Sequence, residues 1–145
     1  MKKNVMVLYV AGKDIGSIAK REAVFNSLLN SLQAEGRTVV RDQRDTRGRT
    51  VTFDDDSKLM HYAYGITVSG HRLTHVYLDP QTLSIEGVDR YLREAVLPFI
   101  LETPRTVDGT YLVEYDIADD RRHRIFLADY DPDHGLSRSV YTPKK

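Results

Sequence analysis

Hydrophobic positions in the first third of the chain predict a strand, a helix and a second strand. Residues 5–10 (VMVLYV) form a continuous apolar run, which is typical of a strand covered on both faces. Within residues 18–32, apolar side chains recur at spacings of three, four and seven, so one stripe of the predicted helix is hydrophobic. Residues 38–42 then read as the second strand.

Two pairs of β-prone runs predict hairpins in the middle of the chain. Residues 37–53 contain an Arg-Gly dipeptide between two such runs. An acidic turn follows at residues 54–57. Beyond it, residues 62–68 and 72–78 flank a Ser-Gly break, so we expect these two runs to pair as a second hairpin.

The last part of the chain predicts a helix followed by another hairpin. The helix is expected to begin near Ser84 and to end or kink at Pro98, because proline lacks an N–H and clashes with the preceding turn. Residues 111–117 and 124–130 are rich in aromatic and branched side chains and flank a charged break. This pattern predicts a β-hairpin.

This order of elements predicts an α+β fold in a single domain, residues 1–145. Each helix has one apolar stripe to bury, so we expect a two-layer mixed β-sheet with two helices on one face. The β–α–β start and the helix before the last hairpin favour a ferredoxin-like core with extra hairpins. An open α/β sheet is the alternative. No internal repeat or linker in the sequence indicates a domain boundary.

Composition narrows the functional classes. The formal net charge is zero, so binding to nucleic acid would require a local basic patch rather than a global field. The chain has no cysteine, which excludes disulfides, zinc–thiolate sites and thiol nucleophiles. The apolar run near the N-terminus is too short for a signal peptide or a membrane span. We therefore expect a cytoplasmic protein without a membrane partner.

Arginines are concentrated in two of the predicted hairpins. The planar guanidinium group donates two parallel hydrogen bonds, which suits phosphate and carboxylate recognition. We predict that both clusters form one ligand-binding surface, with these residues: Arg41, Arg44, Arg47, Arg49, Arg121, Arg122, His123 and Arg124. Aspartates are interspersed among the arginines, so an edge hairpin protected by charge against aggregation is the alternative.

Residues 129–135 (DYDPDHG) resemble the first half of an EF-hand calcium loop. Three carboxylates would form a weak cation site: Asp129, Asp131 and Asp133. The EF-hand loop requires glycine at its sixth position and glutamate at its twelfth, where this chain has His134 and Val140. A turn made of Asp, Pro and Gly is the plainer interpretation.

Three histidines fall between residues 61 and 75. On a strand, His71 and His75 share a face but lie roughly 13 Å apart, too far for one metal ion. This region, which includes His61, can contribute one general base. Half-buried histidines on a sheet are the interpretation that we favour.

Three functions remain open at this point. The first is a binding or regulatory protein that recognises a phosphate-bearing ligand, a nucleic acid or a nucleotide, through the arginine-rich surface. The second is a metal-dependent phosphodiesterase or nuclease that uses aspartates with a histidine as base. The third is an inhibitor or immunity-like protein that binds another protein by charge complementarity. We favour binding without a cofactor, because binding needs only a surface; a homo-oligomer is compatible with each function.

Overall fold

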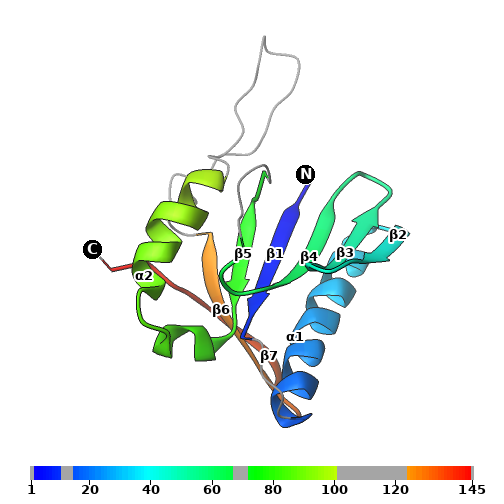
Figure 1. Ribbon diagram of the computed structural model, residues 1–145. Coiled ribbons are helices and arrows are strands. Elements are labelled where there is room, and N and C mark those ends of the chain that lie inside the picture. The colour runs from blue at the N-terminus through cyan, green and yellow to red at the C-terminus, as the bar shows by residue number, and fades with distance from the viewer. Residues whose placement is uncertain (1, 11–14, 67–71, 101–123, 145) are drawn as a thin grey trace.

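A seven-stranded mixed sheet forms the body of this α+β protein (Figure 1). The computed structural model describes residues 2–10, 15–66, 72–100 and 124–144 of the 145-residue chain. The strands are β1 (Asn4–Tyr9), β2 (Val39–Arg44), β3 (Gly48–Phe53), β4 (Lys58–Ala63), β5 (His75–Leu78), β6 (Ile125–Asp131) and β7 (Gly135–Val140). They lie in the order β2-β3-β4-β1-β5-β6-β7.

Two helical regions accompany the sheet. The helical elements are α1 (Ile15–Ala34), the 3₁₀ turn η1 (Pro80–Ser84), α2 (Val88–Tyr91), the π turn η2 (Leu92–Val96) and the 3₁₀ turn η3 (Leu97–Phe99). Helix α1 ends at Ala34, and Gly36 caps its C-terminus. Gly36 has a φ of 100°, and its N–H donates to the Gln33 carbonyl. No helix in the described ranges is long and apolar enough to cross a bilayer.

Strand β1 occupies the centre of the sheet, as its continuous apolar sequence predicts. It runs parallel to β4 on one side and to β5 on the other. All four residues from 5 to 8 are at most 4% exposed. Both faces of the strand are therefore covered, which confirms the interpretation of the apolar run.

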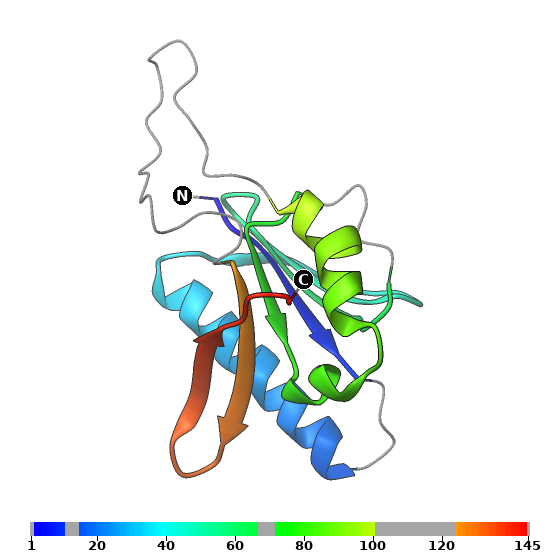
Figure 2. The same cartoon turned by 90° about the vertical axis from the view of Figure 1, so that its left-hand side faces the viewer.

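Helices α1 and α2 cover opposite faces of the sheet, so the predicted placement of both helices on one face is wrong (Figure 2). Val5 and Val7 pack with the apolar side of α1. Met6 and Leu8 pack with residues of α2 and η2. Neighbouring residues of a strand point to opposite faces, so the two clusters lie on different sides. The three-layer arrangement does not confirm a ferredoxin-like core.

The segment 58–78 contains two strands that do not pair with each other, contrary to the predicted hairpin. β4 and β5 both run parallel to β1, which lies between them. The Ser-Gly break that suggested a turn lies outside the described residues. The predicted run 72–78 contains β5, whereas the run 62–68 overlaps β4 only at residues 62 and 63. Local β-propensity also carries no information about a distant strand that inserts between the two.

The β2–β3 hairpin and the acidic turn after it are confirmed. β2 and β3 are antiparallel, with a bulge between Val39 and Arg41. In the acidic turn, Phe53 N–H donates to the Ser57 carbonyl, and Ser57 N–H donates to the Asp55 carboxylate. This turn leads directly into β4, which pairs antiparallel with β3.

The predicted helix begins with α2 at Val88 rather than near Ser84. The Asp79 carboxylate accepts a hydrogen bond from the backbone N–H of Gln81 and starts the 3₁₀ turn η1 instead. Pro98 lies in η3, immediately after the π turn, and the helical segment ends at the next residue. The predicted effect of Pro98 is thus confirmed.

The C-terminal hairpin consists of β6 and β7, and β7 is an element that the sequence pattern does not predict. β6 corresponds to the return arm of the predicted hairpin, whereas residues 111–117, its first arm, lie outside the described residues. β6 pairs parallel with β5 and antiparallel with β7. The sequence of β7, GLSRSV, is too polar to have been recognised as a strand.

Candidate functional site

A cleft lies between the first turns of α1 and the β2–β3 hairpin. Its volume is about 220 Å³. It is lined by Tyr9, Arg21, Glu22, Arg44, Asp45, Gly48, Arg49 and His61. Three of the eight lining residues are arginines, so we describe this arginine cleft as the candidate site.

Two of its arginines are held in place by aromatic rings and hydrogen bonds. The Arg21 guanidinium lies 4.4 Å from the centroid of the Tyr9 ring, and Nη1 donates to the Val10 carbonyl at 3.3 Å. The Arg49 guanidinium lies 4.7 Å from the Phe25 ring centroid and donates two hydrogen bonds, of 2.9 and 2.7 Å, to Asp42. Cation–π contacts of this kind restrict side-chain motion, so both cations are pre-positioned.

Arg44 is the cation with the greatest freedom to bind a ligand. It lies opposite Arg49 in the β2–β3 register and is exposed. It makes no hydrogen bond or ion pair with any residue that the structure describes. Its charge nevertheless acts on Asp42, whose pKa is lowered first by the hydrogen bond from Arg49 and further by the charges of Arg49 and Arg44.

His61 forms part of the cleft wall, between two aromatic rings. The Tyr9 and Phe25 ring centroids lie 4.5 and 4.8 Å from the imidazole centroid. His61 is only 6% exposed, and its Nε2 is buried without a hydrogen-bond partner in the described part of the chain. Burial lowers the pKa of His61 to about 4, and the charges of Arg21, Arg49 and Arg44 act in the same direction. The ring is therefore neutral at neutral pH, in a positive potential.

The β2–β3 turn is pressed against β4, which closes one side of the cleft. The Asp45 carboxylate accepts hydrogen bonds from the backbone N–H groups of Arg47 and Gly48, at 2.7 and 3.2 Å. A Cβ atom on Gly48 would lie 2.0 Å from the His61 carbonyl oxygen. Only glycine permits this approach, so the position of the hairpin beside His61 depends on Gly48.

The structure separates the arginines that the sequence grouped together. Arg44 and Arg49 line the cleft, but Arg41 pairs with Thr52 and faces the opposite side of the sheet. Arg47 lies in the turn, 3.6 Å from Asp45. Arg124 precedes β6, which is separated from β3 by β4, β1 and β5. The structure therefore does not bring Arg124 to the hairpin arginines; Arg121, Arg122 and His123 lie outside the described residues.

The three aspartates of the suggested cation site belong to the β6–β7 hairpin. Asp129 forms an ion pair with Lys20 at 2.7 Å. Asp131 accepts hydrogen bonds from the backbone of Asp133 and from the His134 ring. No three His, Asp or Glu side chains within the described ranges are arranged to hold a metal ion. Asp129 and Asp131 thus have partners within the protein, as the turn interpretation expects, and the cation site stays a prediction.

Comparison with known proteins finds no similar protein. No family model, curated protein or solved structure matches this chain. The function is therefore argued from the geometry of the site.

Sequence reasoning missed Arg21, and it treated His61 only as one of several histidines. Arg21 precedes Phe25 by one helical turn, a spacing at which two side chains share a face of the helix. That spacing indicates from the sequence alone that the Arg21 side chain lies beside Phe25. His61 gave no such signal, because its two aromatic neighbours come from β1 and α1, far away in the sequence.

Proposed function

We propose that this protein is a non-enzymatic binding protein that recognises a phosphate-bearing ligand, a nucleotide or a nucleic acid, in the arginine cleft. The observation that carries the proposal is the convergence of Arg21, Arg44 and Arg49 on the buried imidazole of His61. The three arginines outnumber the two carboxylates that line the cleft, Glu22 and Asp45, and a cleft with excess positive charge attracts anions. Guanidinium groups match the geometry of phosphate oxygens.

His61 shapes the cleft wall rather than contacting a ligand through its buried nitrogen. A buried polar atom without a partner costs roughly 1–3 kcal/mol, so such atoms are rare in folded proteins. Because Nε2 is closed to solvent, a ligand in the cleft would be held by the three arginines and not by this atom.

The chemistry of the site favours binding over catalysis. A histidine with a pKa near 4 is a weak general base at neutral pH. The residues that line the cleft include no serine, threonine or cysteine that could act as a nucleophile. Arginine is always protonated and serves to bind and orient anions.

The proposal is tested by titrating the protein with inorganic phosphate, pyrophosphate and AMP in a calorimeter. The decisive variant is Arg44→Gln, and the matched control is Arg41→Gln, on the same strand but on the opposite face. We expect Arg44→Gln to weaken binding about tenfold or more, because hydrogen bonds to charged groups contribute ~1.5–3 kcal/mol.

The control should bind within about twofold of the unmodified protein, and binding should weaken as salt is raised. Equal effects of Arg41→Gln and Arg44→Gln would show that binding depends on overall charge rather than on the cleft. Absence of binding by all three probes would overturn the proposal.

A further inference from the structure

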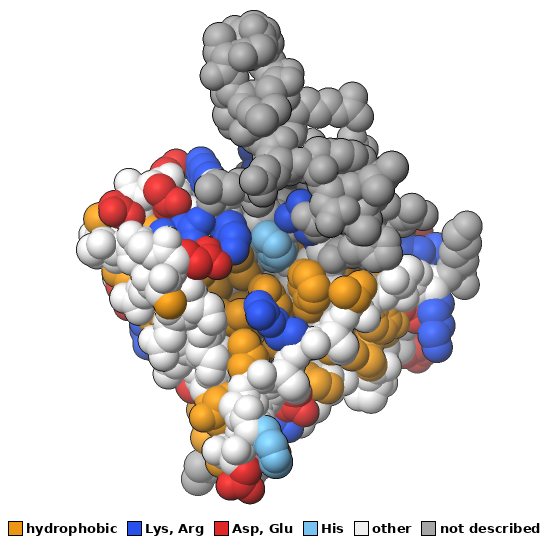
Figure 3. Space-filling model, turned by 180° about the vertical axis from the view of Figure 1, so that it is seen from behind, with side chains coloured by type: hydrophobic (Ala, Val, Ile, Leu, Met, Phe, Trp, Pro, Cys, Tyr) orange, Lys and Arg blue, Asp and Glu red, His pale blue; other side chains and the backbone are white. Residues whose placement is uncertain are grey.

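On the side of α1 away from the arginine cleft, the sheet face of β5, β6 and β7 is only partly covered. A hollow of about 40 Å³ lies there, lined by Lys3, Leu28, Glu35, His75, Tyr77 and Arg138, among others. Figure 3 shows hydrophobic side chains gathered in this hollow, with basic side chains within and around it. We call it the second surface.

Phe126 lies beside the hollow, stacked on the lining residue Tyr77, and we count it as part of the second surface. The ring centroids of Tyr77 and Phe126 are 5.1 Å apart, and those of His75 and Phe126 are 6.2 Å apart, with interplanar angles of 22° and 21°. Tyr77 is buried, whereas His75 and Phe126 are half-buried. Phe126 pairs with Val140 on β7, and the Val140 residue is 51% exposed. Part of this apolar face is thus open to a ligand.

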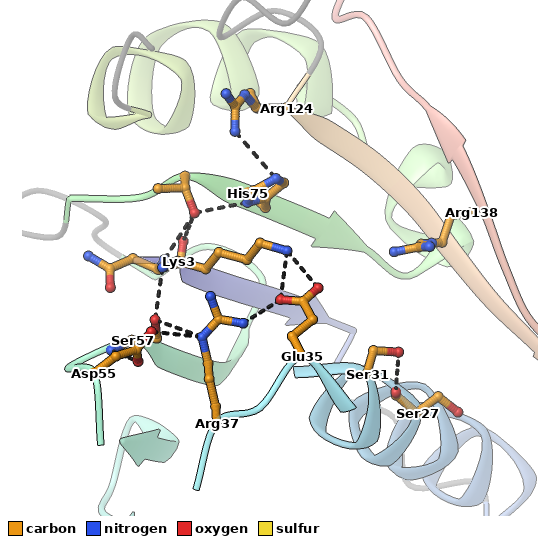
Figure 4. Close-up of polar contacts among 12 residues, drawn as sticks. Lys3, Ser27, Ser31, Glu35, Arg37, Asp55, Ser57, His75, Arg124 and Arg138 are labelled. Atoms are coloured by element: carbon orange, nitrogen blue, oxygen red, sulfur yellow. Dashed lines mark hydrogen bonds and ion pairs between the residues drawn. The ribbon is translucent and has the colours of Figure 1, made fainter. Parts of the chain in front are cut away.

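A chain of hydrogen bonds fixes the His75 ring in its neutral form (Figure 4). Arg124 Nη1 donates to His75 Nε2 at 3.3 Å, so the ring proton lies on Nδ1 and is donated to Thr74 Oγ1 at 2.8 Å. The Thr74 hydroxyl donates in turn to the Asn4 carbonyl. Burial lowers the pKa of His75 to about 4, and the charge of Arg124 adds to this effect. The ring behaves as an uncharged aromatic group.

The ionic groups at the rim are largely paired. Glu35 accepts hydrogen bonds from Lys3, at 2.8 and 3.0 Å, and forms an ion pair with Arg37, which also pairs with Asp55, so two cations balance two carboxylates (Figure 4). Arg138 lies on the opposite side of the hollow, where its Nη1 is 3.4 Å from the Tyr77 hydroxyl. That long contact leaves most of the Arg138 donors available.

We propose that the second surface binds single-stranded nucleic acid, with a base packed against Phe126 and His75 and an adjacent phosphate near Arg138. Stacking platforms flanked by basic side chains are the usual means of holding single strands, since every base has an aromatic face. An acidic peptide would use the cations but would gain nothing from the rings. This inference does not depend on the arginine cleft.

The test is fluorescence anisotropy with a labelled oligo(dT) of about 12 nucleotides, in the range of known single-strand site sizes. Phe126→Leu removes the ring and keeps an apolar side chain, whereas Arg138→Gln removes an exposed charge. Arg93→Gln is the matched control. Arg93 is exposed and belongs to η2, which covers the face of the sheet opposite to the second surface. We expect each of the first two changes to weaken binding about fivefold or more, and the control to change it less than twofold.

Three results would overturn the inference. The first is an equal loss of binding in Arg138→Gln and Arg93→Gln. The second is unchanged binding in a folded Phe126→Leu protein, with folding verified by circular dichroism. The third is equal displacement of oligo(dT) by poly-glutamate and by unlabelled oligo(dT), which would indicate an acidic-peptide surface. Arg138→Gln should leave the titration with inorganic phosphate unchanged, so failure here is distinguishable from failure at the arginine cleft.

Discussion

The imidazole of His61 packs between the rings of Tyr9 and Phe25, and an arginine lies over each of those rings. Ring contacts and cation–π contacts each contribute about 0.5–1.5 kcal/mol, so this group stabilises the fold as well as the cleft. The one unfavourable feature is the buried Nε2 atom. This unpaired atom lowers the stability of the folded protein by roughly 1–3 kcal/mol.

The first prediction follows from that atom. His61→Phe keeps a ring between Tyr9 and Phe25 and removes the buried nitrogen, so we expect the free energy of unfolding in urea to rise by about 1 kcal/mol. Affinity for inorganic phosphate should change less than in Arg44→Gln, because the buried nitrogen does not reach the cleft. His134→Phe is the control, since His134 is exposed and its Nδ1 is hydrogen-bonded to Asp131; a gain in stability in both variants would contradict the explanation.

The arginine content favoured the hypothesis of an anion site in the β2–β3 hairpin, and the prediction placed Arg41 and Arg44 on one surface. Arg41 and Arg44 are three positions apart, and a strand alternates its faces with every residue. Their separation was therefore deducible once the strand was assumed. The contribution of Arg21 was not deducible in this way, because it requires knowing that α1 packs beside β3.

Among the elements, the β2–β3 hairpin places Arg44 and Arg49 beside the cleft only because its turn lies against β4. Gly48 pairs with Tyr62 and approaches the His61 carbonyl too closely for any other residue. An edge hairpin without this contact would leave the two arginines displaced from His61. The turn is therefore as important to the site as the charged residues are.

The second prediction compares two glycines. Gly48→Ala should lower the free energy of unfolding by about 2–4 kcal/mol and weaken phosphate binding, because its Cβ collides with backbone and displaces the hairpin. Gly65→Ala should cost only about 1 kcal/mol, because Gly65 has a φ of 94° but nothing within 4 Å of its added Cβ. Urea denaturation measures the free energy of unfolding of both variants. Equal losses in the two would show that the close approach of Gly48 to the His61 carbonyl does not matter.

Element types were predictable where a pattern was strong and local. The apolar run of β1, the amphipathic stripe of α1 and the Arg-Gly turn of the β2–β3 hairpin each predicted the observed element. The prediction that β4 and β5 pair with each other was wrong, because β1 lies between them and pairs with both. β7 was missed because its side chains are mostly exposed, so hydrophobic burial leaves almost no trace in its sequence.

At the scale of the whole molecule, α1 crosses one face of the sheet and leaves a hollow on each side of it. The arginine cleft adjoins Arg21 and Glu22 on this helix, whereas the second surface adjoins Leu28, Leu32 and Glu35. The sequence could not show this, because an amphipathic stripe reveals that a helix packs on a sheet but not on which face or at which strands. The placement of α2 on the opposite face was missed for the same reason.

The third prediction concerns pH. His61 and His75 both have pKa values lowered to about 4, chiefly by burial. In the unfolded chain each would titrate near 6.5, so between about pH 4 and 6.5 the unfolded state binds more protons than the folded state. Stability is therefore complete above pH 6.5 and is lost as the pH falls toward 4, with a slope of up to about 1.4 kcal/mol per pH unit for each histidine.

Urea denaturation at several pH values measures this slope. His75→Gln should reduce it by up to half, because one of the two buried imidazoles is removed. His134→Gln serves as the control and should leave the slope unchanged, since His134 is exposed. An unchanged slope in His75→Gln would show that His75 titrates normally in the folded protein.

The central position of β1 also bears on how the chain folds as it is synthesised. Asn4 of β1 lies opposite Lys58, and Val5 lies opposite His75, so this strand leaves the ribosome long before either neighbour exists. Pairings between residues so far apart along the chain slow folding and leave apolar segments exposed in the meantime. We therefore expect nascent chains that end before residue 58 to recruit chaperones through VMVLYV, and chains from which residues 58–78 have emerged from the ribosome to release them.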